Sequence, residues 1–241
     1  MRAETRRQLK QDKFSRTTLQ VAEQTVHWSA EHKGKLIAGT VIAIAVIVGG
    51  LGAWYYLSAQ DEKASIEFTK GVQTLNASIR PTGMPPQPDL LSFASARERA
   101  TEAHKQFQAI VDKYPHTRAG DYARYFLGVT SSQLGDFAAA ERELKLVADT
   151  RNSDLSSLAK LALASVYRST GRTKEAVDLY KAFIADPTRV VGKTTAQIQL
   201  AETYEAAGMN ADAKKLYEQI QKESPQTEAG QIASARLQER K

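Results

Sequence analysis

The segment LGVTSSQLGDFAAAERELKLV, residues 127–147, contains the pattern that decides the fold. It is one copy of a unit that recurs every 36 or 37 residues, because its glycine, Gly135, returns as Gly171 and Gly208. A small residue and a large residue keep the same steps, at Ala103, Ala140, Ala176 and Ala213 and at Phe107, Leu144, Tyr180 and Tyr217. A fixed period of this length is typical of a solenoid built from stacked units.

Each position that recurs with this period has a physical role within one unit. A glycine ends the first helix because it takes the left-handed conformation without strain. Asp136 is then an N-cap for the second helix, and we expect Thr173 and Asn210 to act in the same way in later units. The alanines are small because two helices cross closely there. A matching large-small pair occurs on each first helix, at Leu127/Gly128, Leu163/Ala164 and Leu200/Ala201.

This pattern resembles the tetratricopeptide repeat, which adds an aromatic on the first helix and a late proline. The aromatic is present as Tyr167 and Tyr204, whereas Ser131 replaces it in the second unit. The resemblance covers about 96–226 and implies an all-α solenoid of about four helical hairpins. The alternative is an irregular helical bundle.

The ends of the solenoid are expected from the same pattern. The first hairpin is predicted to pair a helix near 62–79 with one near 91–113, around an exposed proline-rich loop at 80–89. A final amphipathic helix at about 226–239 is predicted to cap the stack.

The segment LIAGTVIAIAVIVGGLGAWYYL, residues 36–57, has no charged residue and predicts a transmembrane helix. A helix of that length reaches about 33 Å, and a bilayer core is about 30 Å thick. A cleaved signal peptide is the alternative, but its apolar region and its leader are both much shorter.

The flanks of this segment predict its orientation. Residues 1–35 contain eight Lys/Arg and four Asp/Glu, which places this tail in the cytoplasm. Residues 58–241 are then expected in the periplasm of a bacterium, with the span in the inner membrane. The absence of cysteine fits an oxidising compartment.

Charge and composition exclude several classes of function. After the tail, 25 basic and 23 acidic residues remain, so the net charge of the main domain is only +2. We therefore expect no nucleic acid partner. The four histidines are scattered, and no metal, nucleophile or phosphate-loop motif accompanies them, so we expect no enzyme activity, no cofactor and no small-molecule substrate.

Two sets of residues are candidates for binding proteins. By resemblance to the repeat family, a groove on the first helices is lined by Tyr122, Tyr125, Val129, Leu158, Leu161, Arg168, Thr195, Ile198, Glu202 and Glu205. The alternative is that many of these only pack helices together. Within the span, Ala45, Gly49 and Ala53 form a small-residue stripe of the kind that allows close helix packing in membranes.

The whole layout resembles a narrower group, the YfgM-like ancillary subunits of the bacterial Sec translocon. The local match is WSAEHKGKLIAGT, residues 28–40. This resemblance implies contact with the translocon, with periplasmic chaperones and with emerging polypeptides. The alternative is a membrane-tethered scaffold for cell-envelope assembly or cell division.

Overall fold

The computed structural model describes residues 33–85 and 90–239. The chain divides into two compact units, Met1–Tyr56 and Leu57–Lys241. Nearly all of the predicted tail, 1–35, lies outside the described residues. The described part is mostly helical, which confirms the all-α prediction.

The apolar segment forms helix α2, Lys33–Leu75, the first helix of the described chain. The helix is long and apolar enough to cross a membrane. Its apolar side chains have no cover within the protein, since Trp54 is 68% exposed and Tyr55 is 73% exposed. An apolar surface of this size is typical of a helix that lies in a bilayer or packs against other helices.

Helix α2 does not end with its apolar segment. The helix predicted near 62–79 is instead the last part of α2, which ends at Leu75. The charged residues Asp61, Glu62 and Lys63 lower the hydropathy, but they do not break a helix. The end of the apolar sequence is therefore not the end of the helix.

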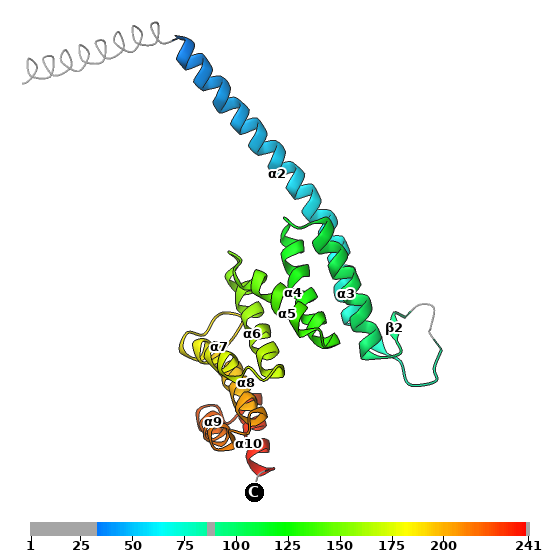
Figure 1. Cartoon of the computed structure of the whole chain (residues 1–241), viewed down its shortest axis with the longest axis vertical. Helices are drawn as coiled ribbons and strands as arrows, with labels where there is room; N and C mark the ends of the chain where they lie inside the picture. The colour runs from blue at the N-terminus through cyan, green and yellow to red at the C-terminus, as the bar shows by residue number, and fades with distance from the viewer. Residues whose placement is uncertain (1–32, 86–89, 240–241) are drawn as a thin grey trace, which may run out of the picture. The chain divides into compact units, whose positions relative to one another are not determined.

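The second unit is a succession of helices, each packed against the next along the chain from α3 to α10 (Figure 1). They are α3 (Ala96–Lys113), α4 (Arg118–Leu134), α5 (Phe137–Ala148), α6 (Ser153–Ser169), α7 (Thr173–Ala185), α8 (Lys193–Ala206), α9 (Asn210–Glu223) and α10 (Glu228–Gln238). With the end of α2 they form the hairpins α2–α3, α4–α5, α6–α7 and α8–α9, and α10 follows as the capping helix. This arrangement confirms the predicted solenoid.

The hairpins close where a small residue meets a large one. Ala140, Ala176 and Ala213 are completely buried at these crossings. A Cβ added to Gly128 would lie 2.7 Å from Cγ of Leu144. A Cβ added to Gly71 would likewise lie 2.7 Å from Cε1 of Phe107. Gly71 therefore occupies in the first hairpin the place of Gly128 in the second.

The turns within the hairpins use glycine as predicted. Gly135, Gly171 and Gly208 have φ of 89°, 74° and 73°, in the left-handed region. Asp136 caps α5, because its carboxylate accepts a hydrogen bond from the Ala139 amide at 2.9 Å. The same prediction was wrong for Thr173 and Asn210. They are the first residues of α7 and α9, and the residues before them, Arg172 and Met209, make no side-chain cap.

A short parallel pair of strands joins the ends of the proline-rich loop. Strands β1 (Ser78–Ile79) and β2 (Ser92–Phe93) pair in the register Ser78↔Ser92. The Arg80 amide extends the ladder to the Phe93 carbonyl at 2.8 Å. The described part of the loop at 81–85 is exposed, and residues 86–89 lie outside the described chain.

Two carboxylates on α2 fix its last turns to the solenoid. Asp61 accepts a hydrogen bond from the Ala119 amide, in the first turn of α4, at 2.9 Å. Glu67 accepts from Lys113 Nζ at 2.8 Å and from the Tyr114 hydroxyl at 3.0 Å. The hydrogen bonds from Lys113 and Tyr114 lower the pKa of Glu67. The end of α2 is thus held by specific polar contacts as well as by its apolar face.

We predict that Ala176→Leu lowers the free energy of unfolding by about 1–3 kcal/mol, because the α6–α7 crossing has no space for a larger side chain. Ala182→Leu is the matched control, since Ala182 is exposed on the same helix. Chemical denaturation followed by circular dichroism measures both. Equal stability of the two variants would contradict the tight crossing.

We predict that Asp61→Ala lowers the free energy of unfolding by about 0.5–1.5 kcal/mol, because the Ala119 amide in the first turn of α4 loses its hydrogen-bond acceptor. Glu62→Ala removes the same charge from an exposed neighbour and should have little effect. Amide hydrogen exchange at Ala119 should speed up only in Asp61→Ala. Unchanged protection of that amide would show that the bond contributes nothing.

Candidate functional site

The groove was predicted on the first helices of three hairpins, which are α4, α6 and α8, and we call the exposed side of these helices the inner surface. Helix α4 contacts α6 directly. Between α6 and α8, Arg168 donates to Glu202 at 3.0 Å and to Gln199 at 3.2 Å. A polar bridge therefore joins the helices in the C-terminal half of this surface.

The predicted groove residues all lie on α4, α6 and α8, but they differ in exposure. Tyr122 is 37% exposed and Thr195 is also exposed, whereas Ile198 is only 8% exposed. The rest are partly buried, namely Tyr125, Val129, Leu158, Leu161, Arg168, Glu202 and Glu205. A partner could reach some of these side chains and not others.

Three of these residues have a clear packing role. Tyr125 packs against the core between α5, α6 and α7, and its ring meets Phe126 edge-on with centroids 5.1 Å apart. Burial also raises the pKa of Tyr125. Leu161 packs against two core clusters, and Ile198 belongs to the core formed with α9 and α10. For Ile198 little surface is left for a partner.

Leu158 differs from these packing residues. It lies on α6 three residues before Leu161, is partly exposed, and belongs to none of the described core clusters. Val129 on α4 is likewise partly exposed and outside these clusters, so Tyr122, Val129 and Leu158 are the predicted apolar residues that are available for contact. Aromatic and aliphatic side chains in such positions often supply most of the binding energy of an interface.

The small-residue stripe lies on α2 in the first unit. Ala45, Gly49 and Ala53 are exposed, and a Cβ added to Gly49 would have no atom within 4 Å. Within the described chain nothing packs against this stripe. Its use in packing against another membrane helix stays a prediction.

A pocket of about 500 Å³ lies at the N-terminal ends of α4 and α6, and the sequence alone did not indicate it. We call it the arginine pocket. It is lined by Arg118, Asp121, Tyr122, Thr150, Arg151, Asn152 and Leu155. The Tyr122 hydroxyl accepts a hydrogen bond from Asn152 Nδ2 at 3.4 Å, which joins α4 to the start of α6. Tyr122 therefore belongs both to this pocket and to the inner surface.

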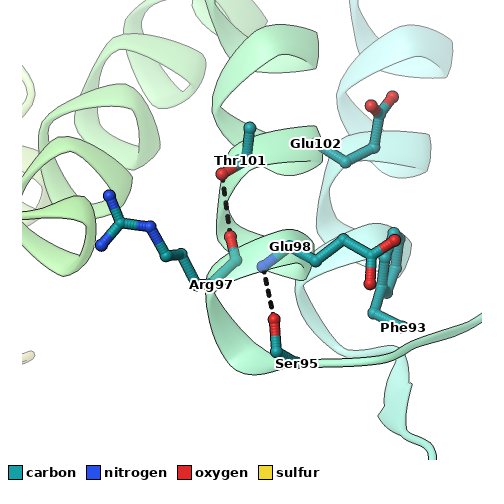
Figure 2. A pocket seen from close by; sticks show the side chains of 6 residues that line it. All are labelled: Phe93, Ser95, Arg97, Glu98, Thr101 and Glu102. Carbon is teal, nitrogen blue, oxygen red and sulfur yellow. Dashed lines mark hydrogen bonds between the residues drawn. The ribbon is translucent and has the colours of Figure 1, made fainter.

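A second pocket of about 460 Å³ lies at the N-terminus of α3 (Figure 2). Ser95 caps α3 by accepting from the Glu98 amide, and the Glu98 carboxylate accepts from the Ala94 amide at 2.7 Å. Figure 2 shows that Arg97 points away from the side on which Glu98 and Glu102 lie. The polar groups of this pocket form a helix cap, and they do not converge on a ligand.

The chemistry available on these surfaces is non-covalent recognition. Among the described residues, no group of three or more His, Cys, Asp or Glu side chains could hold a metal ion. The inner surface offers aromatic, aliphatic and paired charged groups, which suit a peptide chain.

Comparison with known proteins agrees with this architecture. A family model described as a tetratricopeptide repeat-like domain matches residues 26–186, and a second, described as a tetratricopeptide repeat, matches residues 195–227. The first match includes the apolar segment as well as the repeats that follow it. Neither the curated proteins nor the solved structures gave a significant match.

Repeats of this type are typically protein-interaction modules without enzyme activity. The first family model covers about two thirds of the sequence, from the segment before the apolar helix to the end of α7. The chain therefore belongs to the tetratricopeptide repeat-like family.

Proposed function

We propose that this protein is a membrane-anchored interaction module that binds peptide segments of other proteins on its inner surface. The observation that supports this proposal is that α4 contacts α6 and that Arg168 of α6 pairs with Glu202 of α8, while Tyr122 on α4 and Leu158 on α6 keep accessible surface. Apolar groups that stay accessible on a packed domain commonly serve as contact sites. The Arg168–Glu202 pair adds polar groups that can orient a bound backbone.

The apolar part of α2 is the proposed anchor. The excess of basic residues before it supports an N-terminus in the cytoplasm and a repeat domain in the periplasm. An anchor confines the inner surface to a thin layer beside the membrane. Confinement raises the effective concentration for partners in the same membrane, so that weak contacts suffice.

The specific partner that we propose is the Sec translocon, with periplasmic chaperones as recipients of the emerging chains. The arrangement of a short basic tail, one span and a repeat domain supports this choice, as does the local match at 28–40. Two attachments are expected. The span contacts the translocon through the stripe of Ala45, Gly49 and Ala53, and the repeat domain contacts chaperones or emerging chains.

A second candidate function uses the same parts. A tethered repeat domain could instead collect components for cell-envelope assembly or cell division. The two functions differ in the proteins found beside the anchor, and a partner experiment in intact membranes separates them.

We predict that Leu158→Ser reduces crosslinking of partners in cells severalfold without changing the melting temperature, because Leu158 lies outside the core clusters. Leu146→Ser is the matched control, since Leu146 is 54% exposed on α5, outside the inner surface. Tyr125→Ser should instead lower the free energy of unfolding by about 1–3 kcal/mol, since its ring packs on the core. Equal capture by the Leu158 and Leu146 variants would place the partner surface elsewhere.

We predict that the full-length protein, purified in mild detergent after crosslinking in cells, is recovered with the translocon and a periplasmic folding factor. Exchange of residues 36–57 for an unrelated span should reduce recovery of the translocon, because the stripe is lost, but retain the folding factor. Recovery of division or outer-membrane assembly proteins without the translocon would favour the scaffold function.

A further inference from the structure

The arginine pocket contains two cations that have no partner in the described chain. Most arginines of the second unit are paired, as in Arg124–Glu143 at 2.8 Å and Arg172–Glu141 at 2.7 Å. Arg118 and Arg151 are exposed at the pocket and form no ion pair with any residue in 33–85 or 90–239. Their guanidinium groups are therefore available to an external anion.

Polar groups of the pocket wall add to this positive character. The first backbone amides of α4 and α6 contribute partial positive charge, which Asp61 offsets at α4 by accepting from the Ala119 amide. A carboxylate bound in the pocket would accept hydrogen bonds from the guanidinium groups of Arg118 and Arg151.

The acidic residues near the pocket offset this charge only in part. Asp154, in the first turn of α6, is paired with Arg189. Asp121 lines the pocket, and burial raises its pKa against the opposite effect of the neighbouring Arg124. Asp149 is exposed and does not line the pocket.

We propose that the arginine pocket binds the carboxylate of an aspartate or glutamate in the peptide that the inner surface holds. This inference rests on the proposed function, because the peptide must first lie along α4 and α6. Tyr122 connects the two regions, as it lines the pocket and is an accessible groove residue. An extended peptide advances about 3.3 Å per residue, so an acidic residue near the apolar contact can reach the pocket.

The pocket thereby selects among partners. Apolar contacts with Tyr122 and Leu158 accept many sequences, whereas a bidentate guanidinium–carboxylate contact requires an acid at one position. A basic residue at that position is disfavoured by Arg118 and Arg151. Charge in this pocket sets specificity, and the apolar groups supply affinity.

The test uses the full-length protein in a non-ionic detergent and a library of randomised dodecapeptides. Peptides retained by the wild type should contain about threefold more Asp and Glu than the unselected library. The double variant R118Q/R151Q should lose this enrichment. The control double variant R97Q/K181Q removes two exposed cations that form no ion pair within the described chain and lie outside the arginine pocket, and it should keep the enrichment. One retained acidic peptide is also made with Asn or Gln in place of its Asp or Glu. The substituted peptide should bind the wild type about tenfold more weakly than the acidic peptide does, whereas R118Q/R151Q should bind both peptides equally well.

Three outcomes would overturn the proposal: no acidic enrichment with the wild type, enrichment that survives in R118Q/R151Q, or an equal loss in R97Q/K181Q. The inner surface itself is tested by the total amount of peptide retained by Leu158→Ser against Leu146→Ser. Equal totals would contradict the inner surface, whereas the acidic enrichment reports on the pocket alone.

Discussion

The close crossing of two helices within each hairpin is the constraint on which the solenoid depends. At each crossing one partner must be small so that the large residue of the other helix can be buried. Gly128 has no space for a Cβ beside Leu144, and Gly71 has none beside Phe107. Because Tyr180 and Tyr217 are completely buried in the later hairpins, the same pairing of small and large residues sets the helix spacing there. A regular spacing then allows successive hairpins to stack, with α4 in contact with α6.

The period of the sequence predicted this fold because the crossing needs the same residue types at the same step in each unit. It predicted the first helix of the first hairpin near 62–79, but it did not show that this helix is the end of α2 or that Gly71 is its small residue at the crossing. Gly71 is separated from Gly128 by more than one period, since the proline-rich loop lengthens the connection between α2 and α3. Composition also gave no start for this helix, because α2 continues without a break from its apolar segment to Leu75. The two-residue strands have no periodic signal at all, as their pairing depends on the ends of a loop meeting in space.

The candidate site was predicted less completely than the fold. Repeat geometry assigned Tyr122 and Leu158 to the correct helices, but it could not tell them from Ile198, which α9 and α10 cover. Burial at a given repeat position depends on the neighbouring unit, and the last units differ from the first. The arginine pocket left no trace in the sequence because Arg118 and Arg151 lie in different hairpins. Only the lengths of the turns bring the ends of α4 and α6 together, and those lengths are not part of the repeat signature.

The same architecture explains how stability and recognition can be separated in one small domain. Stability comes from the crossings, which are buried between the two helices of a hairpin and tolerate few substitutions. The recognition that we propose would use residues outside the core clusters, such as Leu158 on α6 and Arg151 at the N-terminal end of that helix. Substitutions of these residues can therefore change the partner without loss of the fold. If α2 anchors the protein as we propose, confinement reduces the affinity that each contact must supply, so that a few accessible side chains and one charged pocket would be sufficient for a selective interaction.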